Sequence, residues 1–140
     1  MERHASAVWN GTLKEGNGTM STESGVLKDA GYTWAQRFAD APGTNPEELI
    51  GAAHAGCYSM ALAGRLTTAG FPPDRIATTA NVTLEKTDAG QTVTRIHLVS
   101  RAKVPGIQPA AFAQEAEMTR TTCPISRLLK ADITLDAALE

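Results

Sequence analysis

The stretch NPEELIGAAHAGCYSMALA (residues 45–63) decides the fold of this 140-residue chain, because it predicts one long helix built of small residues. Asn45 suits the N-cap, Pro46 the first helical position and Glu48 the third, which is the pattern of a capping box. The helix should continue until Gly70 and the prolines that follow end it. Both sides of the helix are small or apolar, so we expect it to be buried all round and packed against a sheet.

In the segments before and after this helix in the sequence, apolar and polar residues alternate, as they do in β-strands. Strands are predicted at residues 4–9, 19–24, 32–38, 76–84, 94–104 and 133–137. Arg37 falls in the third of these runs. A turn at residues 87–90 joins the fourth and fifth runs as a hairpin. Further helices are predicted at residues 108–118 and directly after Cys123. The order of strands, helix, hairpin, helices and strand predicts an α+β fold.

Composition and charge are those of a soluble globular protein, with 42% hydrophobic and 20% charged residues. The net charge of -2 and the lack of a dense Lys/Arg run argue against a nucleic-acid partner. No apolar signal core begins the chain, and the apolar stretch at residues 49–63 is too short to span a bilayer. We therefore expect no membrane partner and a cytoplasmic location. The length fits a single domain, residues 1–140.

The only two cysteines, Cys57 and Cys123, lie in different local settings. Cys57 is in mid-helix, where the backbone N–H groups are already used, and burial as a small hydrophobe is the ordinary fate of such a residue. Cys123 precedes a proline at a helix start, where free N–H groups point toward it. The local sequence thus favours Cys123 as the more readily ionised thiol. An equally good interpretation is that Thr122 or Cys123 only caps the helix. In a reducing cytosol two thiols are compatible with a nucleophile and its resolving partner.

Two other arrangements involve His54, and neither is well supported by the sequence. His54 precedes Cys57 by three residues, but no oxyanion hole or third residue accompanies them as acyl transfer would require. A satisfied core histidine is the better interpretation. His54, Cys57, His97 and Cys123 match no common zinc spacing, so no metal site is predicted.

The helix stretch closely resembles the active-site helix of the OsmC/Ohr family of thiol-dependent hydroperoxide reductases. The similarity extends to GTMSTESG (residues 18–25), Arg37-Phe38, Pro42-Gly43-Thr44 and TCPIS (residues 122–126), and so spans most of the chain. Because of the run GAAHA (residues 51–55), the chain is more similar to the OsmC branch, the osmotically inducible type, than to the Ohr branch.

The resemblance implies a role for each of four residues. Cys57 would be the peroxidatic thiol and Cys123 the resolving thiol. Arg37 would stabilise the Cys57 thiolate and polarise the peroxide, and Glu47 would orient Arg37. Taken alone, Arg37 is typical of a solvated strand residue and Glu47 of a carboxylate favoured at a helix N-terminus. Apolar residues expected near the alkyl tail of the substrate are Phe38, Met60 and Ile125.

The implied reaction reduces organic hydroperoxides, and more weakly hydrogen peroxide, to alcohols in oxidative and osmotic stress defence. It passes through a Cys57 sulfenic acid and a Cys57–Cys123 disulfide. No cofactor or metal is implied, but an external reductant is required, either a small dithiol or a lipoylated or thioredoxin-like protein. The alternatives are a non-catalytic redox sensor and a stress-protective binding protein, which steady peroxide turnover would exclude.

The fold implied by the resemblance is an intertwined homodimer in which β-sheets wrap two central helices. Helix geometry adds one expectation. Glu47 and Cys57 are ten residues apart, which is about 15 Å along a straight helix. If both belong to one active site, Glu47 must come from the other subunit together with Arg37, giving two composite sites per dimer.

Overall fold

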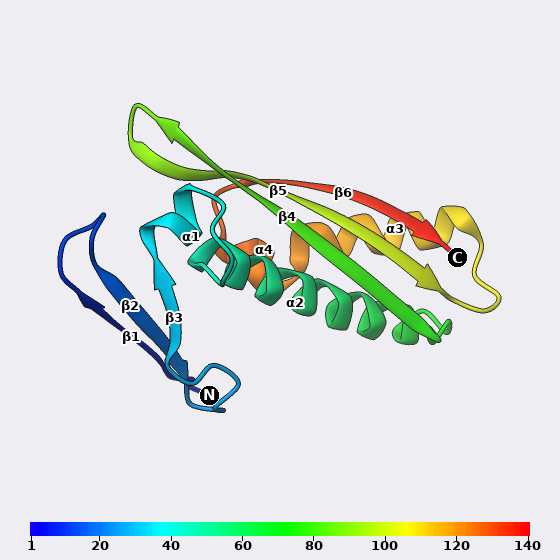
Figure 1. Ribbon diagram of the computed structural model, residues 1–140. Helices are drawn as coiled ribbons and strands as arrows, with labels where there is room; N and C mark the ends of the chain where they lie inside the picture. Colours follow the sequence, from blue (N-terminus) through cyan, green and yellow to red (C-terminus); the bar gives the residue numbers. More distant parts are fainter. The chain divides into compact units, whose positions relative to one another are not determined.

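The computed structural model describes residues 1–140, which divide into two compact units, Met1–Leu49 and Ile50–Glu140. The N-terminal unit is built on a three-stranded antiparallel sheet in the order β1-β2-β3 (Figure 1). Its strands are β1 (Ala5–Asn10), β2 (Asn17–Thr22) and β3 (Ala30–Thr33). The short helix α1 (Trp34–Phe38) follows β3 directly.

Gly18, on strand β2, is a tightly packed position of the N-terminal sheet. A Cβ atom at this position would lie 2.5 Å from the Val8 carbonyl oxygen and within 2.8 Å of the Tyr32 and Trp9 rings. Without that atom the two rings pack on each other, with centroids 5.2 Å apart. Gly18 is also the one buried residue of this unit.

The predicted strand that contains Arg37 is wrong beyond Thr33, where β3 ends. The Thr33 hydroxyl accepts a hydrogen bond from the Gln36 backbone N–H at 3.4 Å and caps α1. Trp34 and Phe38, four residues apart, stack with ring centroids 5.7 Å apart. Apolar residues at i, i+2 and i+4 satisfy a strand, but the i, i+4 pair satisfies a helix equally well. The capping threonine decides between the two.

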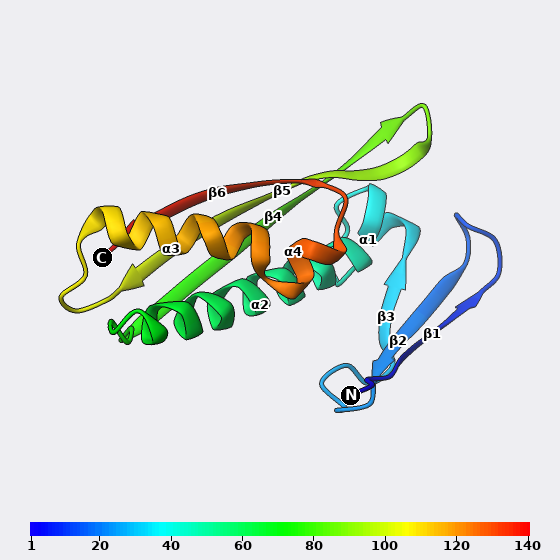
Figure 2. The same cartoon turned by 180° about the vertical axis from the view of Figure 1, so that it is seen from behind.

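The C-terminal unit contains a second three-stranded sheet in the order β4-β5-β6. Its strands are β4 (Arg75–Thr87), β5 (Gly90–Lys103) and β6 (Asp132–Leu139). Strands β4 and β5 form the predicted antiparallel hairpin, and β6 pairs parallel to β5. The helices are α2 (Pro46–Thr68), α3 (Pro109–Thr122) and α4 (Pro124–Leu128). Figures 1 and 2 show α2 and α3 running along the sheet.

Helix α2 begins and ends as predicted. The Asn45 side-chain oxygen accepts the Glu48 N–H at 2.9 Å. At the other end Gly70 has a φ of 89°, and Phe71 N–H donates to the Leu66 carbonyl at 2.9 Å, a Schellman-type end. Within one chain only one face of α2 is covered, so burial all round, as the sequence predicts, would need a partner chain as well. The residues of α2 that are buried are Gly51, His54, Tyr58, Leu62 and Leu66.

The core of the C-terminal unit lies between the sheet and these helices. Its members, with at most 9% of their surface exposed, are Tyr58, Leu62, Leu66, Ile96, Leu98, Ala102, Val104, Ile107, Phe112, Ala116, Cys123 and Ile133. The predicted inward alternation of β5 is confirmed, because Ile96, Leu98 and Ala102 are fully buried. Helix α3 continues to Thr122, four residues beyond its predicted end. None of the helices combines the length and apolar character that crossing a membrane requires.

Candidate active site

The two cysteines meet within the C-terminal unit. Cys57 lies in the middle of α2, and Cys123 lies at the junction of α3 and α4. Both are free thiols, and Cys123 lies close enough to Cys57 to raise the pKa of its thiol. Cys57 is half-buried, whereas only 1% of Cys123 is exposed. The fold thus makes neighbours of two thiols that are distant in sequence.

The surroundings of Cys57 within one chain oppose its ionisation. Burial raises the pKa of the Cys57 thiol, and the neighbouring Cys123 raises it further. A hydrogen bond from the backbone N–H of Ile125 to the Cys57 sulfur acts in the opposite direction and lowers the pKa. The net shift is upward. A reactive Cys57 thiolate therefore requires a positive charge in addition to these neighbours.

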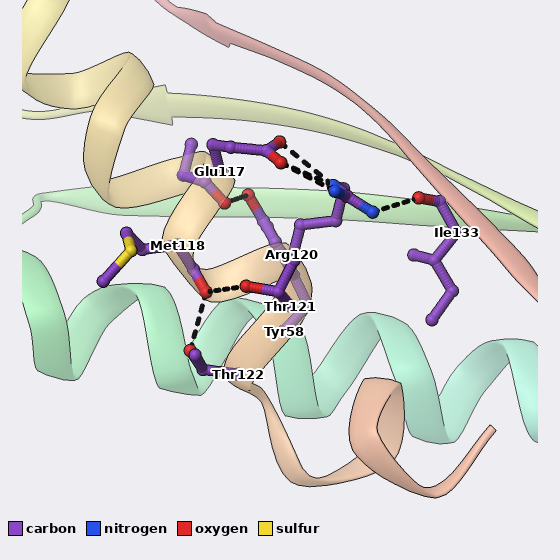
Figure 3. A network of polar contacts seen from close by, with 8 residues as sticks. Tyr58, Glu117, Met118, Arg120, Thr121, Thr122 and Ile133 are labelled. Carbon is purple, nitrogen blue, oxygen red and sulfur yellow. Dashed lines mark hydrogen bonds and ion pairs between the residues drawn. The ribbon is translucent and has the colours of Figure 1, made fainter. Parts of the chain in front are cut away.

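Hydrogen bonds hold together the end of α3, the helix that leads into Cys123 (Figure 3). Arg120 donates to the Ile133 carbonyl of β6 at 2.5 Å and pairs with Glu117 at 2.7 Å. The Thr121 and Thr122 hydroxyls both donate to the Met118 carbonyl. These contacts close the last turn of α3 against β6. Cys123 then caps α4 by accepting the Ser126 N–H at 3.4 Å, which agrees with the capping reading of the sequence.

Arg37 and Glu47 meet within the N-terminal unit. Arg37 Nε lies 3.1 Å from both Glu47 carboxylate oxygens, and Nη2 lies 2.6 Å from one of them. This two-pronged contact fixes the plane of the guanidinium group. It uses one edge of the guanidinium, so further N–H groups of Arg37 are available to a ligand. Glu47 is the more covered partner, with 12% of its side chain exposed against 37% for Arg37.

An aromatic pocket of about 220 Å³ adjoins Arg37 in the same unit. It is lined by Trp9, Leu13, Tyr32, Thr33, Trp34, Arg37 and Phe38. The Phe38 ring lies 5.2 Å from the Arg37 guanidinium carbon. One cation at the wall of an apolar pocket is the arrangement expected for a ligand with a polar head and an apolar tail.

Ser126 and the backbone of Ile125 are contacts that sequence analysis missed. The interpretation of His54 as a satisfied core histidine is half right, because His54 is fully buried and its Nε2 lies 2.8 Å from the Ser126 hydroxyl. Its Nδ1, however, has no hydrogen-bond partner. The signal that could have found Ser126 is its place three residues after the predicted cap Cys123.

The residues weighed as zinc ligands are not arranged to hold a metal ion, and His97 lies apart on β5. His97 Nδ1 lies 2.6 Å from the Thr134 hydroxyl on the neighbouring strand. No group of three or more His, Cys, Asp or Glu side chains is arranged to hold a metal ion.

Comparison with known proteins identifies the relatives of this chain. A family model described as OsmC-like protein matches residues 39–138. Peroxiredoxin OsmC of Escherichia coli K12 is 50% identical over 140 residues, covering 100% of this chain and 98% of the relative. The structure of an OsmC-like protein of unknown function from Vibrio cholerae superposes with a TM-score of 0.78 at 15% identity, over 99% of both chains. The organic hydroperoxide resistance protein OhrB of Bacillus subtilis gives 0.72 at 21% identity, over 98% of both. The structural matches confirm the predicted α+β fold.

Proposed function

Because this chain belongs to the family of OsmC-like proteins, we propose that it is a thiol-dependent peroxidase that reduces organic hydroperoxides to alcohols. A relative that matches it over its full length is named a peroxiredoxin, and a structural neighbour is named for organic hydroperoxide resistance. The observation that supports the chemistry best is that Cys57 and Cys123 are neighbours, close enough for Cys123 to raise the pKa of the Cys57 thiol. Two neighbouring thiols of this kind can supply a nucleophile and its resolving partner.

The reaction we propose has three steps. The Cys57 thiolate attacks the terminal peroxide oxygen, the O–O bond breaks, and the alkoxide leaves as an alcohol after taking a proton. Cys57 is then a sulfenic acid, into which Cys123 condenses with loss of water to give a disulfide. An external dithiol returns both cysteines to thiols by exchange. A small dithiol and a lipoylated or thioredoxin-like protein both fit this last role, and the chain's own residues need no cofactor for the first two steps.

Arg37 supplies the positive charge that Cys57 lacks in this proposal. A guanidinium beside the sulfur favours the thiolate, and its remaining N–H groups can polarise the peroxide. Glu47 holds the guanidinium plane by the contacts described above. Glu47 and Cys57 are ten residues apart on the continuous helix α2, or about 15 Å along its axis. The cation for one Cys57 therefore comes from the partner in a homodimer with two composite sites.

The N-terminal unit supports a homodimer independently, because it has almost no core of its own. Its large apolar side chains Val8, Leu13 and Val26 are 56–84% exposed. A second apolar hollow of this unit is lined by Ala5, Ser6, Ala7, Met20, Ser21, Thr22, Val26, Leu27 and Leu49. A sheet of three short strands that buries only a glycine is not stable alone. A second copy that covers this sheet would turn residues 1–140 into one domain of an intertwined pair.

The preference for organic peroxides follows from the aromatic pocket beside Arg37. An alkyl or aryl tail would fill the pocket while the peroxide group faces the guanidinium. Phe38 lines this pocket, in keeping with its predicted role. Met60, also predicted to contact the tail, is 78% exposed on α2. Hydrogen peroxide gains nothing from apolar walls and should react more slowly.

The test is intact-mass measurement after a stoichiometric addition of organic hydroperoxide to the reduced protein. Wild type should lose two hydrogens as the disulfide forms, whereas Cys123→Ser should gain one oxygen at Cys57. With excess dithiol, hydroperoxide should be consumed steadily, which separates an enzyme from a sensor that reacts once. Oxidation confined to Cys123, with Cys57 left unreacted, would contradict the proposal.

A further inference from the structure

His54, Ser126 and Cys123 form a continuous chain of polar contacts beneath the thiol pair. His54 Nε2 lies 2.8 Å from the Ser126 hydroxyl oxygen, which lies 3.2 Å from the Cys123 sulfur. The same sulfur also accepts the Ser126 backbone N–H. The three residues come from different places, since α2 carries His54, α4 carries Ser126, and Cys123 lies at the start of α4.

All three residues are closed off from solvent. The exposed fractions are 0% for His54, 7% for Ser126 and 1% for Cys123. Bulk water therefore has little access to the Cys123 thiol. When Cys123 forms a bond to another sulfur, its proton must leave through neighbouring protein groups. The Ser126 hydroxyl contacts the sulfur directly, and His54 is the next group in line.

We propose that Ser126 and His54 form a proton relay that serves Cys123 during formation of the disulfide. The inference rests on the proposed function, in which Cys123 attacks the Cys57 sulfenic acid. As the Cys123 sulfur bonds to the Cys57 sulfur, its proton passes to the Ser126 oxygen and the Ser126 proton passes to His54 Nε2. The S–O bond of the sulfenic acid breaks, and the departing hydroxide takes the proton back from His54 through Ser126 to leave as water. The Cys57 sulfur is reduced and the Cys123 sulfur oxidised by one electron each, and His54 returns to neutrality as its proton is given up.

His54 is suited to this role because one of its ring nitrogens has no hydrogen-bond partner. Its Nδ1 has no hydrogen-bond partner, so no carboxylate or carbonyl locks the imidazole in one tautomer. Burial lowers the pKa of His54, which keeps the ring neutral between events. A neutral ring with an unlocked tautomer can accept from Ser126 in one step and donate to it in another. Ser126 can follow both directions, because a hydroxyl donates one hydrogen bond and accepts others.

The same chain of contacts serves the reductive half of the cycle in reverse. When an external thiolate attacks the Cys57 sulfur of the disulfide, Cys123 leaves as a thiolate. In the buried site that anion receives hydrogen bonds from the Ser126 hydroxyl and backbone N–H, and then a proton through Ser126. His54 acts only through Ser126, so it is a positioning residue and proton store for the reaction.

The experiment separates the two oxidative steps. Reduced protein is mixed with stoichiometric tert-butyl hydroperoxide, quenched at increasing times, and read by intact mass for the sulfenic acid and the disulfide. In Ser126→Ala and His54→Gln the sulfenic acid should form at the wild-type rate. Closure of the disulfide should then slow about 100-fold, the lower end of what positioned proton transfer contributes. Glutamine can still hydrogen-bond to Ser126 but cannot take up its proton, so His54→Gln separates proton transfer from packing.

Two further variants separate the relay from a general loss of packing. Ser126→Thr keeps the hydroxyl and should close within a few-fold of wild type. Ser100→Ala removes another fully buried serine hydroxyl of the same unit, one that bonds to Thr78 at 3.1 Å, and should close at the wild-type rate. Wild-type closure in both His54→Gln and Ser126→Ala would overturn the relay. Failure of wild-type Cys57 to oxidise at all would instead overturn the proposed function beneath it.

Discussion

The two units of the chain differ in how much of their surface they bury. The C-terminal unit, Ile50–Glu140, has a core of twelve buried apolar residues. The N-terminal unit, Met1–Leu49, buries only Gly18. Both cysteines lie in the first of these, and the Arg37–Glu47 pair lies in the second. The thiols thus belong to a unit that has its own apolar core within one chain. Arg37 belongs to a unit whose apolar side chains would be covered only by a second copy. An active site assembled from both would form only when the dimer forms.

The largest expected effect is on activity, and it comes from removing the cation. Arg37→Ala should lower kcat/KM for an organic hydroperoxide about 10²–10³-fold, the range for loss of one positioned electrostatic contact at a reacting group. The unfolding midpoint should change little, because Arg37 is not in the C-terminal core. Arg3→Ala is the matched control, since Arg3 also pairs with a glutamate of this unit, at 3.8 Å, and is not near the pocket.

Mixed dimers test whether Arg37 acts on the Cys57 of the other subunit. A heterodimer of one Cys57→Ser chain and one Arg37→Ala chain contains one intact composite site if the cation acts across the subunit boundary. Such heterodimers should recover about half of the wild-type activity, although the Cys57→Ser homodimer is inactive and the Arg37→Ala homodimer keeps only its low residual activity. An absence of activity in verified heterodimers would place the Arg37 and Cys57 of one site on the same chain.

The second prediction compares equal truncations in the two units. Leu62→Ala removes a fully buried side chain and should lower the free energy of unfolding by about 2–5 kcal/mol. Leu13→Ala makes the same chemical change at a position that is 65% exposed within one chain, and it should cost less than Leu62→Ala. Denaturant unfolding at one fixed protein concentration measures both values, because the stability of a dimer depends on concentration. Equal costs at the two positions would contradict the contrast between the units.

Local signals account for the parts of the fold that the sequence predicts well. The Asn45 cap, the glycine end of α2 and the inward alternation of β5 are each set by neighbours in sequence, and each is found. The strand predicted through Arg37 fails because an aromatic pair four residues apart satisfies two periodicities. In the correct and the failed predictions alike, the deciding interaction is short-range. In the failed one it is the hydrogen bond by which the Thr33 hydroxyl caps α1.

The candidate site is harder to predict, because its contacts join distant segments. Cys57 touches Cys123, and His54 touches Ser126, only after α2 and the α3–α4 junction have packed. The spacing of apolar residues along the sequence does not indicate contacts between residues that are so far apart in the chain. The roles expected of Arg37 and Glu47 came from resemblance to a family, whereas taken alone both residues suggest ordinary solvated charges. Their contact is a matter of the fold, and their role in catalysis stays a prediction.

A third prediction concerns Gly18, a tightly packed position of the N-terminal sheet. Gly18→Ala would place a Cβ 2.5 Å from the Val8 carbonyl oxygen, which as backbone cannot move aside cheaply. We expect a loss of about 1–3 kcal/mol, as for other overpacked sites. Gly31→Ala is the control on the adjacent strand β3, where an added Cβ meets nothing within 4 Å. Unfolding curves should show the Gly31 variant at or slightly above wild type, since alanine restricts the unfolded chain.

The smallest expected effect is electrostatic and belongs to the end of α3 (Figure 3). Hydrogen bonding by Arg120 holds the pKa of Glu117 below its ordinary value of 4.5. A lowered folded-state pKa stabilises the protein above the unfolded value and loses that contribution as pH falls through the folded one. Glu117→Gln should therefore cost about 0.2–1 kcal/mol at pH 7, since 58% of the Glu117 side chain is exposed. The difference from wild type should vanish as pH falls well below 4.5.

Thermal unfolding from pH 7 downward measures this contribution, with Glu15→Gln as the control because Glu15 is exposed and forms no ion pair. The Arg120 contact to the Ile133 carbonyl does not require Glu117, so β6 should remain docked on α3 in the variant. A difference that persisted unchanged at low pH would show that Glu117 acts by packing rather than by charge. It would also mean that the end of α3, and with it the position of Cys123, depends on more than the hydrogen bonds drawn in Figure 3.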